Sequence, residues 1–348
     1  MVDTAFHRPA WSRRQVMQGW AAGAMCALWP ARGGAVPSLL TQHPWLQPLL
    51  SQGGYSLPEL SALLTHLAPY PEVVRAMDSQ AEALPWHRYR ARVVTAELVA
   101  AGHHHLKAHR PLLERIQGQY GVPGAVVVAL WGMESRFGAH QGRHPVLRTL
   151  WTLATGYPRR ATLFRQQLVE FLLLCREQGW DPQTIQGSYA GAFGQTQMIP
   201  GTFRSQAVDF DNDGRRDVFS SVPDTLASIA NFLKNHGWEP GGAYTLPLRT
   251  TPGLADQVTK DLERMQPWEF WRNAGVRTAP GSSEPGLQTP AALIMLEELS
   301  MSGEGPPKDE PVYHLAFNNF RVVTRWNNSR RFAMAVGEVF RAIGEERS

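Results

Sequence analysis

One glutamate stands where a general acid would be expected. Glu134 follows an apolar run from Ala125 to Met133, which predicts a helix that is buried on every side. At the C-terminal end of such a helix, burial and the negative end of the helix dipole both disfavour a charged carboxylate, so we expect its pKa to be raised. A raised pKa suits a general acid that works near neutral pH. A helix-end carboxylate paired with Arg136 is the alternative, and position alone leaves both open.

A second group of residues has the spacing of a cation site. Residues 209–217 place acidic side chains at loop positions 1, 3, 5 and 9, with Gly214 at position 6. This matches an EF-hand calcium loop, in which oxygens converge on the ion and glycine permits the sharp turn. Ser220 replaces the bidentate glutamate of position 12, so we expect a weak structural site for Ca²⁺ (or Na⁺), with a solvated acidic turn as the alternative. The expected ligands are Asp209, Asp211, Asp213, the backbone of Arg215, and Asp217.

The third segment, Gly187 to Pro200, combines glycines with uncharged polar groups. Glycine lets a backbone approach a ligand closely. Neutral amides, hydroxyls and aromatic rings suit sugar hydroxyls and N-acetyl groups, whereas the sequence has no glycine motif for nucleotides. A tightly packed structural loop is the alternative. The candidate substrate-binding residues are Ser188, Tyr189, Gln195 and Gln197.

A mainly helical chain must position these groups. Apolar residues recur at helical spacing, and Ser56 to Glu59 predicts a capping box at one helix start. Glycine, proline and threonine increase between 240 and 290, which favours a small β-containing insertion. The predicted helices cover parts of 37–118, then 121–138, 160–178, 223–236, 289–302 and 329–345.

A run of three histidines and a single cysteine are expected to have structural roles. His103, His104 and His105 are consecutive, so on a helix they point in three directions. We therefore expect a solvated face there and no metal site. Cys175 lies in an apolar helical run and is expected to pack in the core.

Taken in order, these motifs resemble the membrane-bound lytic murein transglycosylase B family. The resemblance covers roughly residues 40–345. The segments that carry it are Glu134–Gly138, Tyr157–Arg160, Gly187–Pro200, Ala207–Asp217, Ala230–Trp238, Asn319–Phe320 and Arg325–Ser329.

The resemblance implies a mainly α fold, with a lysozyme-like helical core, an N-terminal helical domain and a small β-containing insertion. It places the N-terminal domain at 37–115, the catalytic core with its EF-hand-like loop at 116–240, the insertion at 241–290 and a return to the core at 291–348.

The same resemblance implies a lytic transglycosylase. Such an enzyme cleaves the β-1,4 bond between N-acetylmuramic acid and N-acetylglucosamine in peptidoglycan and forms a 1,6-anhydromuramic product without a catalytic cofactor. Glu134 matches the acid and base, Ser188, Gln197 and Asn327 match substrate contacts, and Arg159 and Arg160 match a pair that can hold anionic substrate parts. Two alternatives stay open: a muramidase that adds water, and a catalytically weakened peptidoglycan-binding or scaffolding protein.

The chain departs from the family at three aromatic positions. Phe232, Trp326 and Phe332 stand where the family often carries tyrosine. We expect Trp326 to stack on a sugar face, as a Trp ring can. The lost phenol hydroxyls at the other two positions would affect the rate more than the chemistry.

The net charge of the chain is concentrated in its first residues. The 348 residues carry 34 Lys and Arg against 30 Asp and Glu, and 43% are hydrophobic. Residues 1–36 combine paired arginines, a short apolar run and small residues, which predicts a twin-arginine export signal; a buried N-terminal helix is the alternative. Without this segment the net charge falls from +4 to +1, because it holds four of the basic residues and one acidic residue.

This charge distribution excludes a nucleic-acid partner and favours a periplasmic monomer that acts on peptidoglycan strands, with cell-wall synthesis proteins as possible partners. Membrane attachment would require lipidation of Cys26, whose preceding residues match a lipidation motif poorly.

Overall fold

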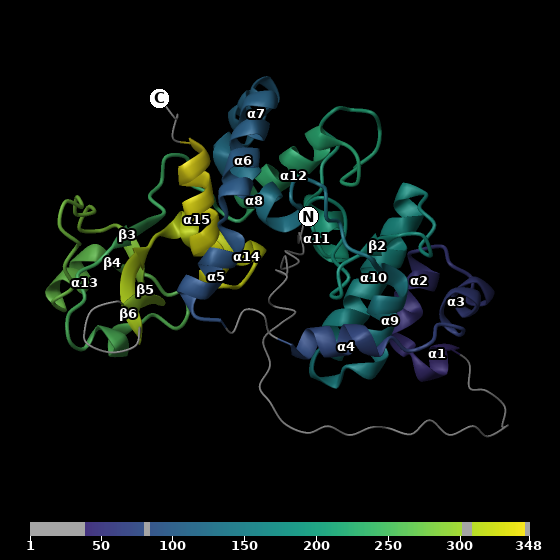
Figure 1. The fold of residues 1–348 in the computed structure, drawn as a ribbon. Helices are drawn as coiled ribbons and strands as arrows, with labels where there is room; N and C mark the ends of the chain where they lie inside the picture. Colours follow the sequence, from purple (N-terminus) through teal and green to yellow (C-terminus); the bar gives the residue numbers. More distant parts are fainter. Residues whose placement is uncertain (1–38, 80–83, 301–307, 345–348) are drawn as a thin grey trace, which may run out of the picture. The chain divides into compact units, whose positions relative to one another are not determined.

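The computed structural model describes residues 39–79, 84–300 and 308–344 of the chain. It is mainly helical with small antiparallel sheets, as predicted (Figure 1). The chain forms two compact units. The described residues of the first unit are 39–79 and 141–205, and those of the second are 84–140, 206–300 and 308–344. The consecutive domain boundaries expected from the sequence stay a prediction, and the expected export signal and Cys26 lie outside the described residues.

The first unit is helical, and its two longest helices, α9 and α10, pack together. A capping box at Ser56 and Glu59 opens α3 as predicted, and Gly179 ends α10 with a left-handed backbone (φ 66°). A short strand pair, β1 with β2, holds the start of the glycine-rich loop. The elements are α1 (Leu39–Gln42), η1 (Pro44–Leu46), α2 (Gln47–Ser51), α3 (Leu57–Leu64), α4 (Pro71–Asp78), β1 (His144–Pro145), α9 (Val146–Gly156), η3 (Pro158–Arg160), α10 (Ala161–Gln178), β2 (Gln186–Gly187) and α11 (Pro200–Gln206), whose last residue belongs to the second unit.

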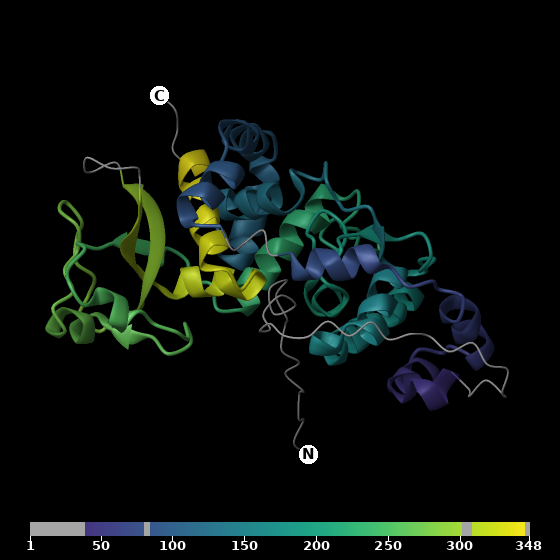
Figure 2. The same cartoon turned by 60° about the horizontal axis from the view of Figure 1, so that its bottom comes forward.

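The second unit is built around α8. This helix packs against α6, α7, α12 and α15 (Figure 2), and ten of its twelve residues are buried. The prediction of a helix buried on every side is therefore confirmed. The helices of this bundle are α5 (Trp86–Val93), α6 (Ala96–Ala108), α7 (Arg110–Tyr120), α8 (Gly124–Ser135), α12 (Val222–Asn235), α14 (Asn318–Trp326) and α15 (Arg330–Gly344).

The second unit also contains an antiparallel sheet of four strands in the order β3-β6-β5-β4. Leu293 of β5 lies opposite Leu315 of β6, and both pack with Trp268 and Trp271 of α13 in a separate hydrophobic core. The elements are β3 (Thr245–Pro247), η4 (Leu254–Gln257), β4 (Gln266–Pro267), α13 (Trp268–Asn273), β5 (Pro290–Ser300) and β6 (Lys308–Ala316).

The helix predicted at 289–302 is wrong, because residues 290–300 form β5. The sheet therefore continues past residue 290 and ends at Ala316. The strand is apolar on both faces: Leu293 lies in the core with α13, while Ile294 and Leu296, which alternate with it, are also buried. A strand that is covered on both sides lacks the alternation that identifies strands in sequence.

No helix among the described residues is both long enough and apolar enough to cross a membrane.

Candidate active site

Glu134 occupies the position that the sequence predicted, in the last turn of the buried helix α8. Its side chain is 9% exposed. The helix ends one residue later, and the next three residues, Arg136, Phe137 and Gly138, all have positive φ (50°, 59° and 88°). Left-handed backbone is unfavourable for residues other than glycine, and such strain concentrates at functional sites.

Side-chain contacts keep this turn in place. The N–H of Gly138 donates to Ser135 Oγ (3.0 Å), and the ring of Phe137 packs edge-on to Trp131 with 5.3 Å between centroids. Gly132 makes room for that ring, since a Cβ there would lie 2.6 Å from Phe137 Cζ. The end of α8, and with it Glu134, is thus held by the packing of Phe137.

The hydrogen-bond partner of Glu134 comes from far along the chain. The indole Nε1–H of Trp326, at the end of α14, donates to Glu134 Oε1 at 2.9 Å. Trp326 is only 5% exposed. Its indole thus contacts the carboxylate, and the stacking on a sugar face that was expected from the sequence stays a prediction.

Asn327, the residue after Trp326, carries an unusual acceptor. Its side chain is 5% exposed, and its Oδ1 is buried with no hydrogen-bond partner among the described residues. A buried polar atom without a partner is costly unless a ligand or water satisfies it. The residue that follows the partner of Glu134 in the chain therefore carries one unsatisfied acceptor.

The glycine-rich loop of the first unit is tightly packed. Two backbone N–H groups, from Ala190 and Ala192, donate to Ser188 Oγ (3.3 and 3.1 Å). Gln197 has a left-handed backbone (φ 49°), and its Nε2 donates to the carbonyls of Gln141 and Gly194, both at 2.9 Å.

This packing orients two polar groups. Ser188 Oγ already accepts twice, so its remaining hydrogen-bonding capacity is as a donor, and no described residue accepts its hydrogen. Both Nε2 hydrogens of Gln197 are used, which leaves its Oε1 as an acceptor. Of the other predicted contacts in this loop, Gln195 is buried and Tyr189 is half-buried.

The arginine pair Arg159 and Arg160 lies in the first unit, and the two residues have different surroundings. Arg159 lies 3.6 Å from the carboxylate of Asp78, which also accepts the Tyr157 hydroxyl at 3.0 Å. Arg160 is 8% exposed, and this burial lowers the pKa of its guanidinium to about 10. Burial of Arg160 limits its access to a ligand.

The acidic loop belongs to the second unit and brings three of its carboxylates together. One oxygen each from Asp209, Asp211 and Asp213 lies within 4.8 Å of the others. Hard carboxylate oxygens that converge in this way fit a cation of the Ca²⁺ type. Among the described residues this is the one such group of three potential metal ligands, so no comparable site is formed by the histidines.

Asp217 does not join that group of three. It accepts hydrogen bonds from the backbone N–H groups of Phe219 (2.7 Å) and Ser220 (3.0 Å), and it therefore closes the following turn. Burial alone would raise the pKa of Asp217, but the hydrogen bonds from Ser220 and Phe219 hold it below its ordinary value.

Sequence reasoning missed the residue that anchors the acidic loop. Asp224, in the first turn of α12, is 0% exposed. Its two oxygens accept the backbone N–H groups of Phe210 (2.7 Å) and Asp217 (2.8 Å), one at each end of the loop. Its place three residues after the N-cap Ser221 looks like an ordinary helix start, so no sequence signal distinguishes it.

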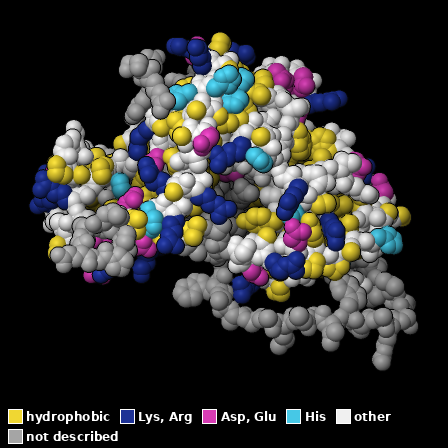
Figure 3. All heavy atoms as spheres, viewed as in Figure 1, with side chains coloured by type: hydrophobic (Ala, Val, Ile, Leu, Met, Phe, Trp, Pro, Cys, Tyr) yellow, Lys and Arg dark blue, Asp and Glu magenta, His cyan; other side chains and the backbone are white. Residues whose placement is uncertain are grey.

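The consecutive histidines are only partly the solvated face that was expected. Figure 3 shows histidine side chains gathered over α6 and α7. His104 is exposed, but His105 packs on Phe137 with 4.4 Å between ring centroids and stacks parallel to His109 at 5.7 Å. Burial, and then the neighbouring histidines, lower the pKa of His105.

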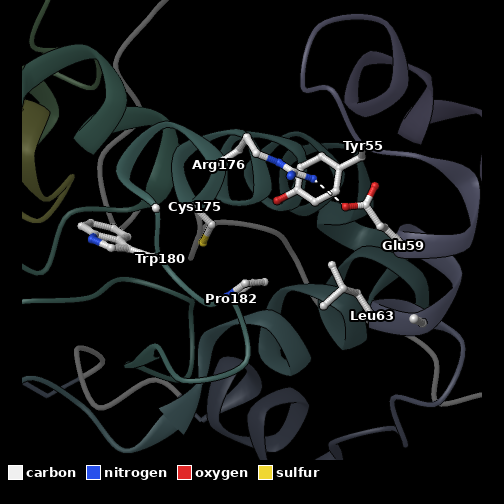
Figure 4. Close-up of a pocket in the computed structure, with 9 residues that line it drawn as sticks. Tyr55, Glu59, Leu63, Cys175, Arg176, Trp180 and Pro182 are labelled. Carbon is white, nitrogen blue, oxygen red and sulfur yellow. Dashed lines mark hydrogen bonds and ion pairs between the residues drawn. The ribbon is translucent and has the colours of Figure 1, made fainter.

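The first unit also contains a cavity of about 470 Å³. Arg176 stacks over Tyr55 at 4.1 Å and pairs with Glu59 at 3.2 Å, so these polar groups satisfy one another (Figure 4). The rest of the lining, including Trp180 and Leu63, is largely apolar. Cys175 lines the cavity and is 1% exposed, which agrees with its predicted core packing.

Comparison with known proteins identifies the family. Residues 41–340 match the family described as the transglycosylase SLT domain. The chain belongs to this family. It is also 30% identical over 323 residues to the membrane-bound lytic murein transglycosylase B of Escherichia coli (strain K12), which covers 89% of this chain and 84% of that protein. The resemblance predicted from the motifs is thereby confirmed.

Solved structures of the family have the same fold. The catenated SltB1 of Pseudomonas aeruginosa matches with a TM-score of 0.78 and 30% identity, over 88% of this chain and 97% of that one. Slt35 of Escherichia coli, solved in complex with calcium, has a TM-score of 0.74 and 29% identity, over 86% and 91%. SltB3 of Pseudomonas aeruginosa, solved with NAG-anhNAM-pentapeptide, has a TM-score of 0.72 and 32% identity, over 89% and 80%. The chain is thus a lytic transglycosylase homologue, a peptidoglycan lyase.

Proposed function

We propose that this protein cleaves the β-1,4 bond between N-acetylmuramic acid and N-acetylglucosamine and closes a 1,6-anhydro ring on the muramic residue. The observation that carries the proposal is the buried carboxylate of Glu134, fixed by Trp326 at 2.9 Å, in a chain of the transglycosylase SLT family. Glu134 would act first as acid and then as base.

The proposed reaction needs one carboxylate. A retaining glycosidase places a second carboxylate about 5 Å away as nucleophile, and an inverting enzyme places one about 6.5–9.5 Å away to activate water. The other buried acidic side chains among the described residues are Glu170 and Asp224. Glu170 pairs with Arg204, and Asp224 anchors the acidic loop, so both have structural roles.

The bonds and protons balance without water. Glu134 donates its proton to the glycosidic oxygen as the bond from that oxygen to muramic C1 breaks, and the N-acetyl group of the substrate stabilises the positive charge at C1. The carboxylate of Glu134 then takes the proton from the muramic C6 hydroxyl as O6 bonds to C1. Glu134 ends protonated, ready for the next bond.

Neutral polar groups would bind the sugars. Ser188 offers a hydroxyl donor, Gln197 an acceptor oxygen and Asn327 a buried acceptor that lacks a partner. Tyr189, Gln195, Arg159 and Arg160 complete the proposed substrate-binding set. The fragments bound to SltB3, NAG-anhNAM-pentapeptide and NAG-NAM-pentapeptide, support glycan strands with peptide stems as the ligand.

We further propose a structural cation at Asp209, Asp211 and Asp213. The convergence of their oxygens and the calcium complex of Slt35 support this assignment. The site would stabilise the loop before α12 and take no part in the chemistry. An exported, periplasmic protein fits both the peptidoglycan substrate and the paired arginines near the N-terminus.

The test is the release of soluble muropeptides from purified sacculi. Glu134→Gln should abolish release while the protein stays folded, because an amide can neither donate the required proton nor take one back. Glu114→Gln is the matched control, since Glu114 is an exposed carboxylate on α7, and it should keep the parent rate. Undiminished release by Glu134→Gln would refute the assignment.

A further inference from the structure

The contact between Trp326 and Glu134 joins two buried side chains that are 192 residues apart in the chain. Trp326 Nε1 donates to Glu134 Oε1 at 2.9 Å, and the two residues are 5% and 9% exposed. Such a bond between shielded groups fixes the carboxylate more firmly than an exposed one would.

Aromatic packing determines the direction of that donor. The ring of Phe232, on α12, meets the Trp326 ring at 73° with 4.8 Å between centroids. Phe232 is 1% exposed and stacks in turn on His236 at 3.9 Å. The Nδ1 of His236 lies 2.6 Å from the carbonyl oxygen of Phe232, which holds this ring in place. These contacts fix the orientation of the indole ring, and its N–H donates to one oxygen of Glu134.

In this contact the indole can act only as a hydrogen-bond donor. An indole N–H donates and cannot accept, whereas a phenol hydroxyl can do either. Protonation of Oε1 would leave it a weaker acceptor for the Nε1 hydrogen than a bare carboxylate or carbonyl oxygen, so this contact favours the hydrogen of the protonated acid on Oε2. A tyrosine at the same place could rotate its hydroxyl and tolerate a hydrogen on either oxygen.

We infer that Trp326 is a positioning residue that directs the catalytic proton of Glu134 to Oε2. The same oxygen then delivers the proton to the leaving group and takes it back from the C6 hydroxyl, while Oε1 stays bonded to Trp326 throughout. Trp326 touches neither the scissile bond nor the reacting oxygens and acts through Glu134 alone. This inference rests on the proposed function of Glu134.

The test compares two Trp→Phe variants. Trp326→Phe removes the donor at Glu134, and Trp271→Phe is the matched control, because Trp271 is another buried indole, whose Nε1 donates to the Ala291 carbonyl at 3.0 Å in the separate core of the sheet. We expect Trp326→Phe to lower kcat by about 10- to 100-fold with little change in KM, as the loss of a positioning contact does. Trp271→Phe should keep the parent kcat.

The dependence of kcat/KM on pH distinguishes a positioning role of Trp326 from a purely structural role, which would leave this dependence unchanged. Without the N–H donor the charged carboxylate is less stable, so Glu134 should hold its proton to higher pH. The alkaline limb of kcat/KM should move up by about one pH unit in Trp326→Phe, since hydrogen bonds to charged groups are worth about that much. Trp326→Tyr, which restores a donor, should move the limb back. A limb that stays in place in Trp326→Phe would overturn the inference.

A spectroscopic measurement keeps the test decisive if a variant folds poorly. In ¹⁵N-tryptophan-labelled parent protein, the Nε1–H signal of Trp326 should shift with pH as Glu134 titrates and should stop shifting in Glu134→Gln. An Nε1–H signal of Trp326 that does not shift with pH in the parent protein would refute the contact. Absence of product from the parent protein would instead refute the proposed function, and the indole signal would still report on the contact.

Discussion

Replacing Asp224 with asparagine tests how the acidic loop is attached to the helical core. Asp224 is fully buried and accepts two short backbone hydrogen bonds, from Phe210 at 2.7 Å and from Asp217 at 2.8 Å. Asparagine has nearly the same shape but only one acceptor oxygen. Its NH₂ group would face one of the two backbone donors, so that a buried N–H loses its partner.

The magnitude follows from these two bonds. A hydrogen bond to a charged group contributes about 1.5–3 kcal/mol, and a buried donor without a partner costs about 1–3 kcal/mol. Asp224→Asn loses one bond and leaves one such donor, so the free energy of unfolding of the second unit should fall by about 3 kcal/mol. Asp224→Ala loses both bonds and should cost more.

The assay is denaturant unfolding with excess chelator present, so that metal binding does not contribute. Hydrogen exchange at the amides of Phe210 and Asp217 gives a local readout, and both amides should lose protection. Asp256→Asn is the control, because Asp256 is an exposed carboxylate in the same unit, and it should change stability by less than about 0.5 kcal/mol. Equal stability of the Asp224 and Asp256 variants would refute the anchoring role.

Three further predictions concern other parts of the chain. Gly132→Ala should destabilise the fold by about 1–3 kcal/mol, because the new Cβ would lie 2.6 Å from Phe137 Cζ; Gly118→Ala, where nothing lies within 4 Å of the added carbon, should instead be mildly stabilising in urea unfolding. Burial, and then Arg341, lower the pKa of His314 to about 4. As pH falls from about 6.5 to 4, this histidine is therefore protonated in the unfolded chain but not in the folded chain. The free energy of unfolding should drop by roughly 3 kcal/mol across that window. His314→Leu should flatten the measured dependence of stability on pH. Chelation should lower the melting temperature and added calcium should restore it; an unchanged melting temperature up to millimolar calcium would contradict a bound ion.

The sequence predicts best where one local pattern decides the structure. The apolar run before Glu134 predicts a buried helix because every face of it is hydrophobic, and α8 is buried on every side. The capping box at Ser56 and Glu59 and the stop at Gly179 also follow from neighbouring residues alone.

Prediction fails where distant residues decide. The segment that forms β5 is rich in Ala, Leu, Met and Glu, which favour helices, and only pairing with β6 and burial on both faces make it a strand. The contact between Trp326 and Glu134 was not predicted, because nothing near Trp326 in sequence shows that its indole reaches Glu134. Asp224 was missed for the same reason, since its two partners belong to a loop that folds back onto it.

The mass of the product released from purified sacculi tests the central claim most directly. If Glu134 alone acts as acid and then as base, with the C6 hydroxyl as the internal nucleophile, the muropeptides will carry 1,6-anhydromuramic ends, and Glu134→Gln will release none. Products one water heavier, with a reducing end, would contradict the account, because they require a water to be activated where the account has none.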